Sequence, residues 1–201
     1  MYGLLNFPSY EAQGRYYASQ LFTTPQTTTN NVAVDSKLSE IIIPSINVKA
    51  PVIYEPSVNN TNIAYDLRSG VVHYGSTALP GEKGNVAIFG HSSGVAWELG
   101  NYKFIFTLLD KLRPGQQITL DYKGVRYVYV VTDTTVVAPS DMKVLHSNGT
   151  KSQLSLITCT PVGTSRNRLV VHADQIHPDP QANASFKSAN AAGSLNELPS
   201  N

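Results

Sequence analysis

Short apolar runs separated by polar turns recur through the middle of this chain and predict a mainly β domain. The runs predict strands at 40–44, 46–54, 85–90, 118–122, 125–131, 134–138, 153–159 and 168–173. The clearest pair is 118–122 and 125–131, which Lys123-Gly124 joins as a two-residue hairpin turn, because glycine supplies the positive φ that such a turn needs. So many short strands at regular spacing favour a sandwich or a barrel.

Helical periodicity is confined to two short segments. Between Tyr102 and Leu112 the apolar residues fall on one helix face, and Arg113-Pro114-Gly115 then acts as a stop signal. These apolar residues are Phe104, Ile105, Leu108, Leu109 and Leu112. A second, short helix is predicted from Met142 to Leu145, with Ser140 or Asp141 as its N-cap. The pattern therefore predicts a β-rich domain with one or two short helices.

Both ends of the chain lack a core-facing apolar stripe. We divide the chain into an N-terminal segment and linker at 1–36, a folded domain at 37–177 and a flexible tail at 178–201. The linker and the tail are polar and small, so burial cannot offset the entropy of ordering them. The aromatic residues between Met1 and Tyr17 favour a short helix over the domain or its groove.

Composition and charge narrow the class of protein. With 201 residues, 41% of them hydrophobic, the chain can bury one core. Lys and Arg number 15 against 14 Asp and Glu, so no basic excess attracts nucleic acid, and we expect no nucleic-acid partner. Cys159 is the only cysteine, which forbids an internal disulfide and makes its thiol a candidate reactive group.

Three residues at strand ends could together form an acyl-transfer site. Cys159 closes the predicted strand 153–159, and Arg168 opens the next one. If those strands pair, the thiol can attack a carbonyl carbon while the guanidinium holds its oxygen. His91, at the end of the run 85–90, is the candidate acid and base. From residue type alone, however, a buried structural cysteine outweighs a catalytic one by roughly three to one.

Several blocks in the order of the chain change that balance, because together they resemble the sortases, the cysteine transpeptidases that attach proteins to bacterial cell walls. Ser155-Leu156-Ile157-Thr158-Cys159 resembles the family's Thr-Leu-x-Thr-Cys signature, with serine in place of the first threonine. The other matching blocks are Ile42-Ile43-Pro44-Ser45-Ile46-Asn47-Val48 with Pro51-Val52, then His73-Tyr74-Gly75-Ser76, Leu79-Pro80-Gly81, Gly84 to His91, and Arg168-Leu169-Val170-Val171. The resemblance runs from about Leu38 to about Ala173.

The resemblance implies a closed eight-stranded β-barrel with the active site in a groove on its wall. His91, Cys159 and Arg168 would be the catalytic residues, with His73, Thr158 and Arg166 structural or close to the substrate. Arg166 competes with Arg168 because residues two apart share a strand face, and the resemblance selects Arg168. The Thr158 hydroxyl either helps to fix the oxyanion or simply suits a strand.

The resemblance also implies the partners and the place of action. The acyl donor would be a sorting-signal peptide of the Leu-Pro-x-Thr-Gly or Leu-Ala-x-Thr-Gly type, and the acceptor an amine of a cell-wall precursor or a pilin. The sequence looks closest to housekeeping sortases of the class D or E type, acting at the outer face of the bacterial membrane. Family members usually carry a membrane-spanning helix first, whereas residues 1–36 hold no run of the ~18 to 20 apolar residues that spanning needs. We expect an anchor that was removed, a different tether, or none.

Other interpretations stay open on the residues alone. A hydrolytic cysteine peptidase would use the same thiol and histidine but usually orients the imidazole with Asn or Asp. A non-catalytic β-barrel binding module, or a transpeptidase acting on peptidoglycan itself, is also conceivable. We expect no cofactor: there is no His-x-x-x-His or cysteine pair for zinc and no acidic cluster for calcium. Leu198-Pro199-Ser200-Asn201 looks like the start of a sorting signal, but without the Thr-Gly pair we interpret it as chance.

Overall fold

The computed structural model describes residues 14, 18, 35, 39–54, 60–94, 100–147, 149–186 and 197–199. The helix and linker predicted over residues 1–36 therefore lie outside the described residues, apart from three isolated positions. Among the described residues, no helix is both long and apolar enough to cross a membrane.

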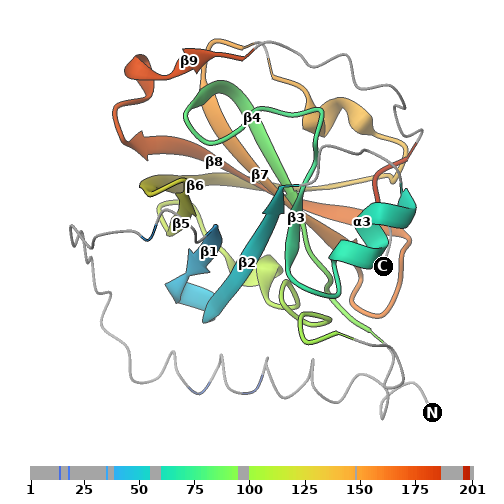
Figure 1. Ribbon diagram of the computed structural model, residues 1–201. Coiled ribbons are helices and arrows are strands. Elements are labelled where there is room, and N and C mark those ends of the chain that lie inside the picture. The colour runs from blue at the N-terminus through green and yellow to red at the C-terminus, as the bar shows by residue number, and fades with distance from the viewer. Residues whose placement is uncertain are drawn as a thin grey trace.

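Nine strands form the framework of the described residues (Figure 1). They are β1 (Glu40–Ile43), β2 (Val48–Tyr54), β3 (Val71–His73), β4 (Glu82–Phe89), β5 (Gln117–Tyr122), β6 (Val125–Val137), β7 (Ser152–Thr160), β8 (Asn167–His177) and β9 (Ala184–Ser185). The helical elements are α3 (Asn60–Asp66) and the 3₁₀ turns η1 (Pro44–Ile46), η2 (Leu109–Lys111), η3 (Met142–Leu145) and η4 (Pro180–Ala182).

The first eight strands close into a barrel. Their order is β3-β2-β1-β5-β6-β8-β7-β4, and β4 pairs back onto β3 through Val72 with Phe89 and His73 with Ile88. The pairs β2–β3 and β4–β7 are parallel, and β9 pairs in parallel with the first two residues of β4. This confirms the closed eight-stranded barrel. The predicted hairpin is also confirmed, with Lys123 and Gly124 both at positive φ.

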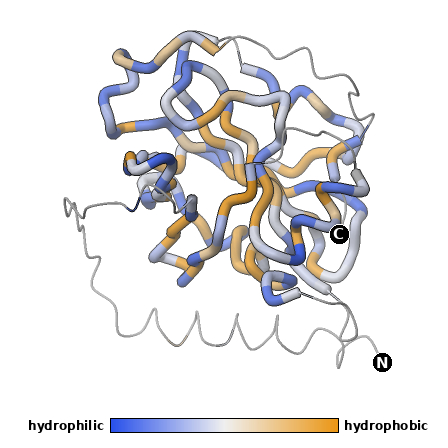
Figure 2. The backbone as a smooth tube through the Cα atoms, in the orientation of Figure 1, coloured by the Kyte–Doolittle hydropathy of each residue, from blue (hydrophilic) through white to orange (hydrophobic). Residues whose placement is uncertain are grey.

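Apolar side chains pack on both sides of the barrel wall. Along β7, Leu154 and Leu156 belong to the interior cluster, whereas Ile157 belongs to an outer cluster. The outer cluster lies under α3 and η3 and consists of Ile63, Leu67, Val72, Tyr74, Ala87, Phe89, Leu145, Ile157, Val170 and Leu198. Figure 2 shows the apolar central strands that result. A wall buried on both faces explains why 153–159 reads as a continuous apolar run.

The prediction of a helix from Tyr102 to Leu112 is wrong. The segment forms successive turns and ends in η2, with bonds such as Leu109 N–H to Phe106 O at 3.1 Å in place of α-helical ones. Phe106, Leu109 and Leu112 are nevertheless buried in the interior cluster. The apolar spacing therefore reports burial against the barrel, while tertiary contacts decide the backbone conformation.

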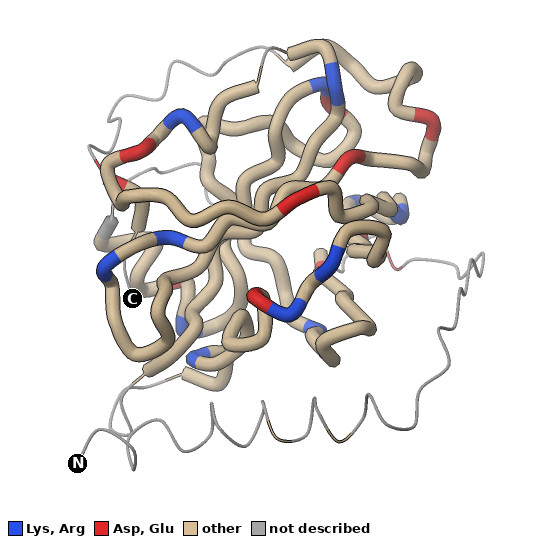
Figure 3. Tube along the Cα trace, turned by 180° about the vertical axis from the view of Figure 1, so that it is seen from behind, with Lys and Arg blue, Asp and Glu red and all other residues tan. Residues whose placement is uncertain are grey.

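Smaller differences concern element boundaries and the tail. The predicted strands 125–131 and 134–138 are one strand, β6, with a register shift between Val131 and Asp133. The short helix is a 3₁₀ turn, η3, and Asp141 caps it by accepting from Lys143 N–H at 3.2 Å. Within the predicted flexible tail, β9 pairs with β4, η4 lies against β8, and Leu198 is buried. In Figure 3 the acidic and basic residues are interspersed over the surface.

Candidate active site

Cys159 lies near the end of β7, on the outer face of the barrel wall. Alternation along the strand places its side chain on the same face as Ile157 of the outer cluster. The residue is 2% exposed. The thiol therefore lies at the edge of the apolar surface that α3 covers, where β7 ends.

Arg168 is paired directly with Cys159 in the antiparallel ladder between β7 and β8. Side chains of directly opposed residues stand on one face with Cβ atoms about 4.5–5.5 Å apart, so thiol and guanidinium are neighbours. Arg168 is also 2% exposed, and all three of its side-chain nitrogens donate to backbone carbonyls. Nη1 bonds to Ser165 O at 3.0 Å and to Asn167 O at 3.1 Å.

The remaining two nitrogens of Arg168 bind a segment from the far end of the chain. Nη2 donates to Leu198 O at 3.0 Å, and Nε donates to Pro199 O at 2.8 Å. A buried cation is tolerated only when its hydrogen-bonding groups are satisfied, and these carbonyls satisfy it. Arg166, in contrast, is exposed and precedes β8. The structure thus distinguishes Arg168, which lies beside Cys159, from Arg166, a distinction that the two-residue period of a strand could not make.

His91 follows β4 and is held beside the end of β7. Phe89 pairs with Ile157, and Gly90 N–H continues the contact by donating to Ile157 O at 3.1 Å. His91 therefore lies two residues beyond a paired position, as Cys159 does. It is buried, and its carbonyl accepts from Phe106 N–H at 2.9 Å. The three predicted catalytic residues come together on adjacent strands or their ends.

Thr158 connects the two halves of this arrangement. Its Oγ1 donates to Gly90 O at 2.6 Å, which fixes the residue before His91 to the residue before Cys159. A Cβ added at Gly90 would stand 2.4 Å from the Phe106 ring, so only glycine allows this close approach. The hydroxyl of Thr158 is therefore committed to positioning the His91 loop.

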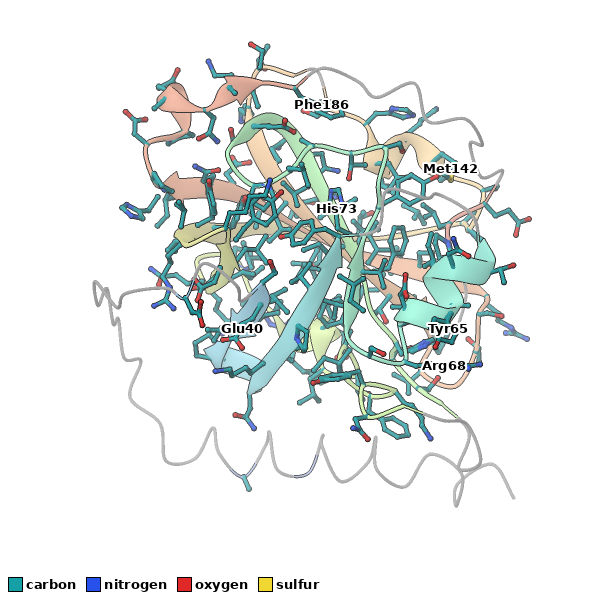
Figure 4. The ribbon with its side chains drawn as sticks, in the orientation of Figure 1. Glu40, Tyr65, Arg68, His73, Met142 and Phe186 are labelled. Atoms are coloured by element: carbon teal, nitrogen blue, oxygen red, sulfur yellow. The ribbon has the colours of Figure 1, made fainter. Side chains whose placement is uncertain are left out.

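His73 points into the barrel, away from the thiol. Its Nε2 lies 2.9 Å from Ala78 O, and its ring centroid is 5.2 Å from that of Tyr54 (Figure 4). Burial lowers the pKa of His73 to about 4, so the ring is neutral near pH 7. Its partner across the ladder, Ile88, belongs to the interior cluster. This location favours the structural role among the two that we considered.

Two recesses meet at Cys159. A pocket of about 190 Å³ lies on one side and is lined by Ser92, Phe106, Thr107, Asp110, Thr158, Cys159, Thr160, Pro161, Val162 and Leu169. On the other side a narrow crevice of about 10 Å³ is lined by Leu67, Phe89, Gly90, Ile157, Thr158, Cys159 and Pro199. The larger pocket adjoins Cys159 on the side of Phe106 and Leu169, whereas Pro199 lines the crevice on the side toward α3.

Two features of the site were missed from the sequence. Ser155, which stands where the signature has threonine, donates to Asn85 Oδ1 at 3.0 Å and lies 3.1 Å from His172 Nδ1, so it joins β4, β7 and β8. Asn85 in turn donates to Val144 O at 2.9 Å. The contact of Arg168 with Leu198 and Pro199 was the second omission. Neither leaves a local pattern, since each joins residues far apart in the sequence. Among the described residues, no three His, Cys, Asp or Glu side chains form a metal-sized group.

Comparison with known proteins identifies the family. The Sortase domain profile matches residues 41–176. Sortase A of Streptococcus agalactiae serotype III (strain NEM316) is 28% identical over 158 residues, which are 78% of this chain and 59% of that protein. Sortase D of Bacillus subtilis (strain 168) is 28% identical over 137 residues, 67% of this chain and 61% of that protein. The chain thus spans about three fifths of the length of these curated relatives.

Solved structures show the same barrel. Sortase C-1 from Actinomyces oris superposes with a TM-score of 0.58 at 27% identity, with 86% of each chain covered. The lid mutant of sortase A from Corynebacterium diphtheriae gives a TM-score of 0.59 at 26% identity, covering 87% of this chain and 95% of that one. The profile match extends from β1 into β8 and so includes His91, which follows β4, as well as Cys159 of β7 and Arg168 of β8. On these matches, the chain belongs to the sortase family of cysteine transpeptidases.

Proposed function

We propose that this protein cleaves a sorting-signal peptide between threonine and glycine and transfers the threonyl acyl group to an amine. The proposal rests chiefly on one observation: Cys159 and Arg168 are directly paired on one face of the barrel wall, with the His91 loop fastened beside them. The donor would be a peptide of the Leu-Pro-x-Thr-Gly or Leu-Ala-x-Thr-Gly type. The acceptor would be an amine of a cell-wall precursor or a pilin, at the bacterial cell surface.

In the first step, the Cys159 thiolate attacks the threonine carbonyl of the peptide. Arg168 donates to the oxygen as negative charge develops on it. The imidazolium of His91 gives its proton to the glycine nitrogen as the carbon–nitrogen bond breaks. The products are a thioester on Cys159 and a free amine.

In the second step, neutral His91 removes a proton from the incoming amine, which attacks the thioester. Arg168 again holds the oxyanion, the carbon–sulfur bond breaks, and Cys159 leaves as thiolate. A new amide forms and the starting protonation states return. The two steps balance without metal or cofactor.

The test is mass spectrometry of the intact enzyme mixed with a panel of sorting peptides. We expect an adduct equal to the acyl fragment on wild-type protein and none on Cys159→Ala. Arg166→Ala is the matched control for Arg168→Ala, because the two arginines are two residues apart and only Arg168 adjoins the thiol. The adduct should still form with Arg166→Ala and should not form with Arg168→Ala.

Product analysis distinguishes transfer from hydrolysis. With an added amine, most of the acyl group should appear as the amide; equal hydrolysis with and without amine would indicate a cysteine peptidase instead. The pH profile of kcat/KM should be bell-shaped, because one group must be deprotonated and another protonated. In water, a thiol of pKa ~8.5 and an imidazole of pKa ~6.5 are both ionised in only ~1% of molecules near pH ~7.5. A single ionisation between pH 5 and 10 would contradict these roles.

A further inference from the structure

The chain's own Leu198 and Pro199 occupy one side of the candidate active site. Both carbonyls accept hydrogen bonds from Arg168, at 3.0 and 2.8 Å. Its third nitrogen, Nη1, is taken by Ser165 and Asn167 of its own strand end. The two nitrogens that could face a substrate are therefore engaged by the segment 197–199.

Leu198 is held as a peptide ligand would be, by its side chain and its backbone together. The side chain is 2% exposed and belongs to the outer cluster with Ile63 and Leu67, which lie on or just after α3. Its N–H donates to Pro139 O at 2.7 Å. Figure 1 shows this short red segment beside α3, the helix that Tyr65 marks in Figure 4. A leucine side chain thus fills an apolar subsite next to the catalytic arginine.

Pro199 brings the segment up to the thiol. It is buried and shares the narrow crevice with Cys159, Thr158 and Leu67. Only about 10 Å³ of that crevice remains free, about one probe sphere of water. A second peptide cannot enter this side of the site while Pro199 is in place.

We propose that Leu198-Pro199 is an internal peptide ligand of the active-site groove, which competes with the acyl-donor peptide for Arg168 and for the apolar subsite under α3. This inference rests on the proposed function, because it takes the groove beside Cys159 to be the donor site. In the sequence, Ser200 falls at the variable position of such a motif and Asn201 stands where the motif has threonine, so the segment offers no threonine carbonyl for acyl transfer. The resemblance of Leu198-Pro199 to the start of a sorting signal then reflects a shared mode of binding and not chance.

The test removes the leucine anchor and measures access to the thiol. Leu198→Asp places a charge in the apolar subsite and should release the segment, whereas Ile176→Asp makes the same change at a residue of β8 that is 51% exposed. If the groove is open in about one molecule in ten, releasing the segment should raise alkylation of Cys159 by iodoacetamide about tenfold. The KM for a sorting peptide should fall by a similar factor. The control should match wild type in both.

A synthetic peptide of residues 195–201 provides the converse measurement. Added to Leu198→Asp, it should slow alkylation, and the same peptide with aspartate for leucine should not. Unchanged alkylation in a folded Leu198→Asp protein, or no protection by the peptide, would overturn the inference. If Leu198→Asp does not fold, Leu198→Ala takes its place, with a smaller increase expected. Loss of folding in both would show that the segment is an integral part of the core and would also overturn the inference.

Alkylation separates this inference from the proposed function. Alkylation requires only an accessible thiol, so it reports on the segment even if no peptide forms a thioester. Faster alkylation without any acyl adduct would refute the transpeptidase function and leave the segment's position supported. Efficient transfer with no effect of Leu198→Asp would refute the inference alone.

Discussion

The bond from Thr158 to Gly90 allows a sharp test of how the site is assembled. Thr158→Val keeps the shape of the side chain and removes the hydroxyl that donates to Gly90 O at 2.6 Å. Thr158→Ser keeps the hydroxyl and removes a methyl group. The pair therefore separates the hydrogen bond from packing at one buried position.

The size of the effect follows from burial. Thr158 and Gly90 are both buried, so the substitution by valine leaves the carbonyl without this donor, at a cost of about 1–3 kcal/mol. For a domain of this size each kcal/mol lowers the melting temperature by about 2–4 °C. The bond also positions the His91 loop, and a misplacement of ~1 Å can reduce catalysis on the order of 100-fold. We therefore expect kcat/KM to fall about 10- to 100-fold in Thr158→Val.

Thermal unfolding by circular dichroism and steady-state transfer kinetics measure the two effects. Thr158→Val should melt about 2 to 12 °C lower, with the loss of activity mainly in kcat, whereas Thr158→Ser should keep most of the activity. Equal activity in Thr158→Val and wild type would show that the bond does not position His91 for its proposed role. A serine variant as impaired as the valine variant would assign the effect to packing.

Three further outcomes follow from other contacts. Arg168→Lys should reduce kcat/KM by at least about 100-fold, because one ammonium group cannot replace hydrogen-bond donors on three nitrogens. The same substitution at the exposed Arg166 should leave kcat/KM nearly unchanged. Similar losses in both variants would refute the role assigned to Arg168. The pKa of His73 is lower in the folded protein than in the unfolded chain, so its contribution to stability is present above pH 6.5 and is lost as pH falls toward 4, by up to about 3 kcal/mol. Urea unfolding at several pH values should show this loss in wild type. In His73→Gln the free energy of unfolding should depend less on pH. Gly90→Ala should destabilise the fold by about 1–3 kcal/mol, because its methyl meets the Phe106 ring at 2.4 Å, and an unchanged melting temperature would contradict this crowding.

The sequence predicted strands well where burial was regular. The predicted run 153–159 falls within β7, and the run 85–90 matches β4 except for its last residue, because a wall covered on both faces demands continuous apolar residues. Closure into a barrel came from the family resemblance, since pairing partners leave no trace in local periodicity. The three-residue β3 and the seven-residue α3 were missed because they are too short to show a period.

The sequence predicted the three candidate catalytic residues but not the contacts around them. Motif blocks selected His91, Cys159 and Arg168, and the structure brings these three together. The helix predicted from Tyr102 to Leu112 does not form, because the spacing of its apolar residues reflects their burial inside the barrel. The role of Leu198 could not be read from the sequence, because its binding site consists of α3, β4, β7 and β8.

The parallel pairing of β4 with β7 also has a consequence for the folding pathway. It joins Gly90 to Thr158 across a separation of 68 residues, so Cys159 and His91 cannot meet until that long loop has closed. Closing such a loop is an entropically slow event that local hairpins do not need. During refolding, the hairpin β5–β6 should therefore form first, and catalytic competence should appear only as the barrel is completed.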